Sequence, residues 1–191
     1  MRFSSLRLTG HQRSGTHYVA AVISLNFLGS FDYKNIYLNH KLPEVVKIKN
    51  IGYLYVFRNF NDVANSVFKM RGRFGLQAND FNSFLNTKYN KMWSNEPYNG
   101  INIYDVDGRH KTDFKVSNYF KKIKHTPKEW WTRYYKSWEK AERKKPNVIK
   151  VSYDHLINDF EAEMTHICRT LACPKPLTGF KNIERRIGWI P

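Results

Sequence analysis

Short apolar runs alternate along the chain with longer segments whose apolar residues recur at helical spacing. Four of the short runs are typical of strands: 3–8, 33–38, Ile51–Phe57 and 148–151. The run Ile51–Phe57 is apolar almost throughout, as in strands buried in a parallel sheet. Three of the four are followed by a helical pattern. The sequence therefore predicts one α/β domain over residues 1–191, a three-layer sandwich with a central parallel sheet.

Capping signals place the starts of three helices. Thr126-Pro127-Lys128-Glu129 combines a capping box with proline at the first helical position, and Lys145-Pro146 ends that helix. Asn61 and Asn158 are predicted to cap the helices that follow the third and fourth strands. Between 72 and 126 the signals weaken to a helix over 80–92 and an Asn-, Gly- and Tyr-rich loop over 94–109.

A glycine loop connects the first strand to a helix that is apolar almost all round. It reads Gly10-His11-Gln12-Arg13-Ser14-Gly15-Thr16. Glycines allow a tight turn and the first helical amides point into it, so such a loop binds phosphate. The two glycines have the spacing of a nucleoside triphosphatase loop, but Thr16 and His17 stand where that motif has Lys and Ser or Thr. This difference disfavours a P-loop kinase and predicts a site that requires no metal.

The charge of the chain indicates an anionic partner. It has 32 Lys and Arg against 16 Asp and Glu, a formal net charge of +16, and its hydrophobic content of 41% is that of a folded protein. Nucleic acid, a polyanionic nucleotide and an acidic glycan all fit this charge. No RNP, KH or zinc-finger pattern supports a nucleic-acid-binding module. Without a signal-peptide pattern or 18 consecutive apolar residues, the sequence predicts a cytoplasmic protein with no membrane contact.

Two motifs resemble those of one enzyme family. Gln-Arg-Ser-Gly-Thr-His-Tyr, at 12–18, resembles the 5′-phosphosulfate loop of the sulfotransferases. Arg58-Asn59-Phe60-Asn61-Asp62, with Ser66 four residues on, resembles their Arg-Asn-Pro-x-Asp-x-x-x-Ser signature, with Phe60 in place of proline. The motifs occur in the family's order, so the resemblance implies that 3′-phosphoadenosine 5′-phosphosulfate (PAPS) is the donor and 3′-phosphoadenosine 5′-phosphate (PAP) the product.

The resemblance also implies roles for individual residues. In the family, the loop holds the 5′-phosphosulfate, the Arg and Ser of the second motif bind the 3′-phosphate, and a Tyr after the fourth strand contacts the adenine. The family's Arg-Lys-Gly closing loop has no match in the sequence: either Arg185 and Arg186 replace it, or the closing loop is shorter or absent. The implied cofactor-binding residues are Arg13, Ser14, Gly15, Thr16, His17, Tyr18, Arg58, Ser66, Tyr153, Arg185 and Arg186.

The catalytic base is expected in Asn39-His40-Lys41-Leu42-Pro43, which resembles the family's Lys-Thr-His-Leu-Pro. If the histidines are matched, His40 is the general base; if Leu-Pro is matched, Lys41 takes that place. An imidazole with a pKa of about 6.5 accepts a proton at neutral pH, which favours His40. Arg13 and Lys41 are the further catalytic candidates, because their charge can steady the transferring group.

These expectations combine into one function. The chain is predicted to transfer a sulfuryl group from PAPS to a hydroxyl or amine of a small-molecule or glycan acceptor. Its basic surplus favours an anionic or polyhydroxylated acceptor, with thirteen Lys and Arg against four Asp and Glu between Lys111 and Lys150. By analogy with the family, 72–126 is the acceptor-specificity region. The acceptor itself and the oligomeric state are left open, and no nucleic-acid partner is expected.

Overall fold

The computed structural model describes residues 3, 5–11, 13–27, 37–39, 42–43, 50–71, 78–88, 102–104, 110–112 and 125–183. Its strands are β1 (Ser5–Gly10), β2 (Tyr37–Asn39), β3 (Ile51–Phe57), β4 (Asn102–Tyr104), β5 (His110–Thr112) and β6 (Val148–Ser152). Its helices are α1 (Thr16–Phe27), α2 (Phe60–Lys69), α3 (Phe81–Asn86), α4 (Pro127–Lys144), α5 (Tyr153–Asn158) and α6 (Phe160–Leu171). None of the helices in this described part is both long and apolar enough to cross a membrane.

The main sheet is parallel, as the sequence predicts. Its strand order is β2-β1-β3-β6, and β1 pairs with both β2 and β3. The pairs Gly10–Val56 and Phe57–Ser152 place the last residues of β1, β3 and β6 at the same edge of the sheet. The residues that follow these three strands therefore lie close to one another although they are far apart in the sequence.

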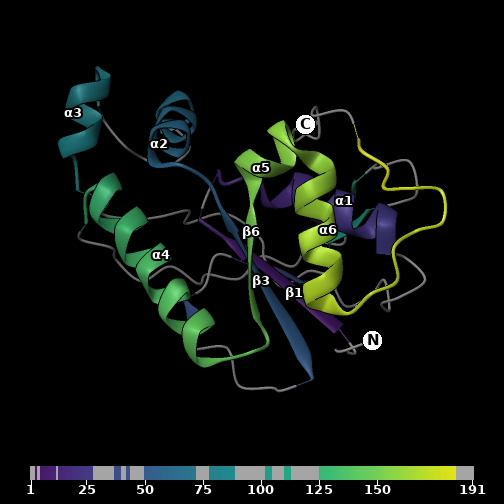
Figure 1. The fold of residues 1–191 in the computed structure, drawn as a ribbon. Coiled ribbons are helices and arrows are strands. Elements are labelled where there is room, and N and C mark those ends of the chain that lie inside the picture. The colour runs from purple at the N-terminus through teal and green to yellow at the C-terminus, as the bar shows by residue number, and fades with distance from the viewer. Residues whose placement is uncertain are drawn as a thin grey trace.

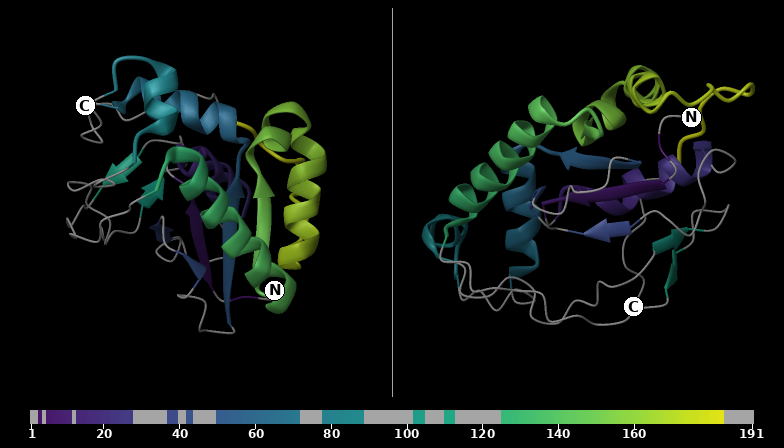
Figure 2. Two further views of the ribbon diagram at one scale, coloured as in Figure 1. Left: turned by 90° about the vertical axis from the view of Figure 1, so that its left-hand side faces the viewer. Right: turned by 90° about the horizontal axis from the view of Figure 1, so that it is seen from below.

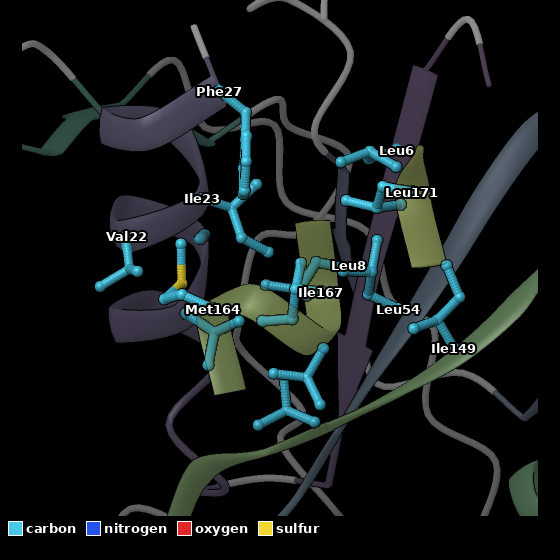
Figure 3. Close-up of a cluster of buried hydrophobic side chains, with 14 of the residues drawn as sticks. Leu6, Leu8, Val22, Ile23, Phe27, Leu54, Ile149, Met164, Ile167 and Leu171 are labelled. Atoms are coloured by element: carbon cyan, nitrogen blue, oxygen red, sulfur yellow. The ribbon is translucent and has the colours of Figure 1, made fainter. Parts of the chain in front are cut away.

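Helices cover both faces of the sheet and confirm the predicted three-layer architecture (Figures 1 and 2). β3 shows how the two cores arise. Leu54 and Val56 point to one face and pack with residues of α1 and α6, whereas Tyr53 and Tyr55 point to the other and pack with α2 and α4. Side chains alternate along a strand, so a continuous apolar run supplies both cores. Figure 3 shows the first of them, with Ile23 of α1 and Ile167 of α6 turned toward Leu8 and Leu54.

The start of α4 is as predicted. The Glu129 amide donates to Thr126 Oγ1 at 3.3 Å, and Glu129 Oε2 accepts from the Thr126 amide at 2.8 Å, which completes the capping box. The bond from the Thr126 amide favours the ionised carboxylate and lowers the pKa of Glu129. The helix ends at Lys144, before Pro146, because proline cannot continue it.

Several boundaries differ from the sequence prediction. Asn59, not Asn61, caps α2, since its Oδ1 accepts from the Asp62 amide at 3.0 Å. Likewise Asp159, not Asn158, caps α6. The helix expected over 80–92 is shorter, as α3 ends at Asn86. Part of the loop expected over 94–109 is strand: β4 pairs antiparallel with β5. Strands of three residues are too short to show an alternating pattern.

Candidate functional site

The candidate site lies at the carboxyl edge of the sheet, between β1 and β3. The helices that follow these neighbouring strands pack on opposite faces: α1 joins the core of Figure 3, and α2 joins the core that contains Tyr53 and Tyr55. Parallel α/β sheets bind their ligands at such a point, because the two connections diverge and leave a crevice. The predicted phosphate loop and the second motif thus meet at this position.

The loop from β1 to α1 has the tight geometry of an anion-binding turn. The Ser14 amide donates to the His11 carbonyl at 3.0 Å, and both Arg13 (φ 65°) and Gly15 (φ 90°) have left-handed backbone conformations. At Gly10 there is no room for a side chain, since a Cβ there would lie 2.4 Å from Ser14 Oγ. The turn leaves Arg13 exposed and buries Ser14 and Thr16 at the start of α1.

The two motifs are joined by direct hydrogen bonds. Arg13 Nε donates to Ser66 Oγ at 2.9 Å, and Arg58 Nη1 donates to the Arg13 carbonyl at 3.2 Å. Asp62 lies four residues after Arg58, and its Oδ2 is 3.9 Å from Arg58 Nε. Two guanidinium groups and a hydroxyl therefore gather within one small region, where their donors can serve more than one phosphate.

Tyr153, the first residue of α5, closes one side of this region. Its ring packs edge-on against the ring of Tyr18, with centroids 5.7 Å apart, and Arg58 Cζ lies 4.6 Å from its centroid. A Cβ at Gly15 would lie 2.2 Å from the Tyr153 ring, so only glycine fits beneath it. Tyr18 also donates its hydroxyl to Asn182 Oδ1 at 2.7 Å. His17 is half-buried in the first turn of α1.

A family model matches most of the chain. The family model of the sulfotransferase domain matches residues 37–185. The chain belongs to the sulfotransferase family. The match includes Arg58, Ser66 and Tyr153 but begins after the predicted phosphate loop, so the loop is a separate observation. No curated protein sequence matches the chain.

Solved structures of sulfotransferase fold agree with the family match. Mouse sulfotransferase SULT7A1, complexed with PAP, has a TM-score of 0.57 at 18% identity, with 93% of this chain and 61% of that chain covered. Retinol dehydratase, complexed with androsterone and the inactive cofactor PAP, has a TM-score of 0.54 at 13% identity, with 94% and 63% covered. At these identities the likeness establishes the fold. The chain spans less than two thirds of the length of either protein.

Aromatic residues of α4 support the candidate site through three hydrogen bonds. The hydroxyls of Tyr134 and Thr9 share a hydrogen bond of 2.7 Å, and Tyr135 donates its hydroxyl to the Val56 carbonyl at 3.0 Å. Trp131 Nε1 donates to the Arg58 carbonyl at 3.1 Å. Burial raises the pKa of both tyrosines, which keeps their hydroxyls protonated. The sequence shows an aromatic helix face here, but nothing in it indicates these polar contacts.

Two further residues near the site were not among those predicted from the sequence. The buried ring of His11 packs against those of Tyr134 and Tyr135, at centroid distances of 5.8 and 6.4 Å. Asp154 Oδ2 accepts from the Asn59 amide at 3.2 Å and from Asn59 Nδ2 at 3.3 Å, which links α5 to the start of α2. The only available signal for Asp154 was its place directly after Tyr153.

Four predicted site residues lie outside the described part of the chain. They are His40, Lys41, Arg185 and Arg186. The strand that leads to the first two is described: β2 ends at Asn39, which is paired with Thr9 of β1. The described residues thus bring together Arg13, Ser14, Gly15, Thr16, Tyr18, Arg58, Ser66 and Tyr153 at one sheet edge.

Proposed function

We propose that this protein transfers a sulfuryl group from PAPS to a hydroxyl or amine of an acceptor. The hydrogen bond from Arg13 to Ser66 carries the proposal. It joins a phosphate loop to the second motif, and a nucleotide with phosphates at both its 5′ and 3′ positions needs two such anion sites side by side. The PAP bound in the related structures is consistent with this donor.

The residues at the sheet edge fit such a nucleotide. Arg13 and the amides of the tight loop, with Ser14, Gly15, Thr16 and His17, are suited to the 5′-phosphosulfate. Arg58 and Ser66 are suited to the 3′-phosphate, and the rings of Tyr18 and Tyr153 offer apolar surface for the adenine. Arg185 and Arg186 are proposed to close over the 3′-phosphate and adenine of the nucleotide.

The chemistry requires charge neutralisation and a base. When bound, PAPS supplies the sulfuryl group, whose bond to the 5′-phosphate breaks as the acceptor oxygen or nitrogen attacks sulfur. The guanidinium of Arg13 is proposed to neutralise the charge that grows on the departing phosphate. His40 is proposed to take the acceptor's proton, and Lys41 to steady the sulfonate. Both follow directly after β2, whose last residue pairs with β1 at the site edge.

Nucleotide binding tests the proposed 3′-phosphate site. PAP is expected to bind more tightly than AMP by isothermal calorimetry, because only PAP can engage Arg58 and Ser66. Charge-assisted hydrogen bonds contribute roughly 1.5–3 kcal/mol each, so Arg58→Ala should weaken PAP binding at least about tenfold. It should leave AMP binding nearly unchanged.

Arg169→Ala is the matched control, since it removes an equally charged side chain from the exposed surface of α6. It should bind both nucleotides like the unmodified chain. Equal affinities of the unmodified chain for PAP and AMP would refute the 3′-phosphate assignment.

The acceptor is proposed to be anionic or polyhydroxylated and to be selected by the segment 72–126. The exposed surface of α4 is basic, and its start borders a groove of about 530 Å³ lined in part by His125, Lys128 and Arg133. The exposed cations along the helix are Lys128, Arg133, Lys136, Lys140, Arg143 and Lys144. Trp131 contacts Arg58 from the same helix, so this surface begins beside the site.

Salt dependence tests the charge of the acceptor. With a charged acceptor, KM should rise with ionic strength, because salt screens the attraction between exposed charges. The Debye screening length is about 10 Å at 0.1 M salt. Replacing Lys136, Lys140 and Lys144 by Gln should raise KM roughly fivefold, given about 0.2–1 kcal/mol per exposed ion pair. Replacing Lys69, Arg169 and Lys181 by Gln removes the same charge elsewhere and should have little effect. Turnover of a neutral phenol with a salt-independent KM would contradict this proposal.

A further inference from the structure

Glu163 of α6 is a buried acidic residue at a position surrounded by core. The residue is 7% exposed, and Met164 and Ile167 of the same helix are fully buried. Glutamate is almost never buried unless it has partners, because removing a carboxylate from water is costly. The partners of Glu163 therefore indicate why an acidic residue stands at this position.

Both carboxylate oxygens of Glu163 face the turn from β6 into α5. Oε1 accepts from the Ser152 amide at 2.7 Å, and Oε2 lies 3.5 Å from His155 Nδ1. Ser152 is the last residue of β6 and also caps α5, since its Oγ accepts from the His155 amide at 3.2 Å. One side chain of α6 thus contacts both ends of this cap.

Tyr153 lies inside the segment that Glu163 fixes. It follows Ser152 directly, and its ring lies against Gly15, Tyr18 and Arg58. A rotation of the Ser152 backbone would therefore move the ring away from the phosphate loop or into it. No contact of Glu163 with the loop itself is needed for this effect.

We infer that Glu163 is a positioning residue for the nucleotide site: it orients Tyr153 through the backbone of Ser152. The inference rests on the proposed function, because it assigns Tyr153 to nucleotide binding. Stability alone is a poor explanation for the residue. A buried carboxylate is often no better for stability than an apolar side chain of similar size.

Nucleotide affinity tests the inference through three variants. Glu163→Ala should raise the Kd for PAP about tenfold, the effect of losing one hydrogen bond that involves a charged group. Glu163→Gln keeps an oxygen that can accept from the Ser152 amide, so its Kd should stay within about twofold. Met164→Ala removes a neighbouring core side chain; it should lower Tm while leaving the Kd unchanged below the unfolding range. All three are measured by calorimetry at a temperature where each variant is folded.

Two further measurements separate positioning from general destabilisation. Hydrogen exchange at the Ser152 amide, measured without nucleotide, should accelerate in Glu163→Ala and stay slow in Glu163→Gln and Met164→Ala. In a Tyr153→Ala background, Glu163→Ala should cause less than a twofold further change in Kd, because the ring that it positions is gone.

The outcomes discriminate between the two claims. If the unmodified chain fails to bind PAP, the proposed function is wrong and this inference falls with it. If the unmodified chain binds PAP and Glu163→Ala binds equally well, the proposed function stands and the positioning role is wrong. A full tenfold loss of PAP affinity on Glu163→Ala in the Tyr153→Ala background would also overturn the inference, since the effect would then not act through the Tyr153 ring.

Discussion

Replacing His40 by alanine is expected to lower kcat by roughly 10² to 10⁴ and to leave the Kd for PAP nearly unchanged, as for loss of a general base. The expectation follows from position and chemistry. His40 comes directly after β2, and β2 ends beside β1 at the edge that carries the phosphate loop. An imidazole with a pKa of about 6.5 is mostly uncharged at neutral pH and can accept the acceptor's proton. Steady-state kinetics with an acceptor that the unmodified protein sulfates measure kcat, and calorimetry measures the Kd for PAP.

Lys41→Ala is the paired variant, and its effect on kcat should be smaller. An ammonium group would need a strongly lowered pKa to act as a base, whereas its charge is well suited to steadying the sulfonate. The opposite pattern, with near-normal turnover in His40→Ala and loss of turnover in Lys41→Ala, would show that Leu42-Pro43 sets the correct match to the family motif. Lys41 would then occupy the catalytic position.

Gly15→Ala is expected to weaken PAP binding roughly 10²-fold, the second largest effect. Two costs combine at this position. An alanine at φ 90° is strained, which costs about 1–3 kcal/mol, and its Cβ would lie 2.2 Å from the Tyr153 ring. Relief of that clash requires the loop or the ring to move, and both are proposed to contact the nucleotide. Calorimetry with PAP measures the loss.

Gly179→Ala separates the two costs. Gly179 also has a left-handed backbone, at φ 77°, but no atom lies within 4 Å of the position that a Cβ would take. Its substitution should lower stability by about 1 kcal/mol without changing the Kd for PAP. If Gly15→Ala bound PAP as tightly as Gly179→Ala does, the close fit between the loop and Tyr153 would have no role in binding.

Local signals were sufficient to predict much of this fold. The apolar run Ile51–Phe57 became the central strand with its predicted bounds, because only a strand buried on both faces needs so many apolar residues in succession. The capping box at Thr126 fixed the start of α4, since both of its hydrogen bonds form within four residues. The loop and the second motif were located from residue spacing and family resemblance, and the structure brings them together at one sheet edge. Their part in binding a nucleotide stays a prediction.

Contacts between distant residues could not be predicted in this way. The Tyr134 hydroxyl meets Thr9 across 125 positions, and the Asn59 amide meets Asp154 across 95. Each pair depends on which strands become neighbours, and no local pattern encodes that order. Asn59 and Asn61 are equally good caps by residue type, and the hydrogen bond from Asp62 selects the first. No local pattern singles out Glu163 either, because its contacts depend on where the turn from β6 into α5 lies.

The hydrogen bonds from α4 have a consequence for selectivity. They anchor the end of β1, the end of β3 and the backbone at Arg58, so three segments that border the candidate site are fixed to one helix. The entropy of ordering these segments is lost during folding and not when a ligand arrives. If the proposed anion sites are held in this way, the protein is expected to discriminate by the spacing between them. A nucleotide with a single phosphate would leave one of the two proposed sites unmatched, and rearranging the fixed segments to compensate would be costly.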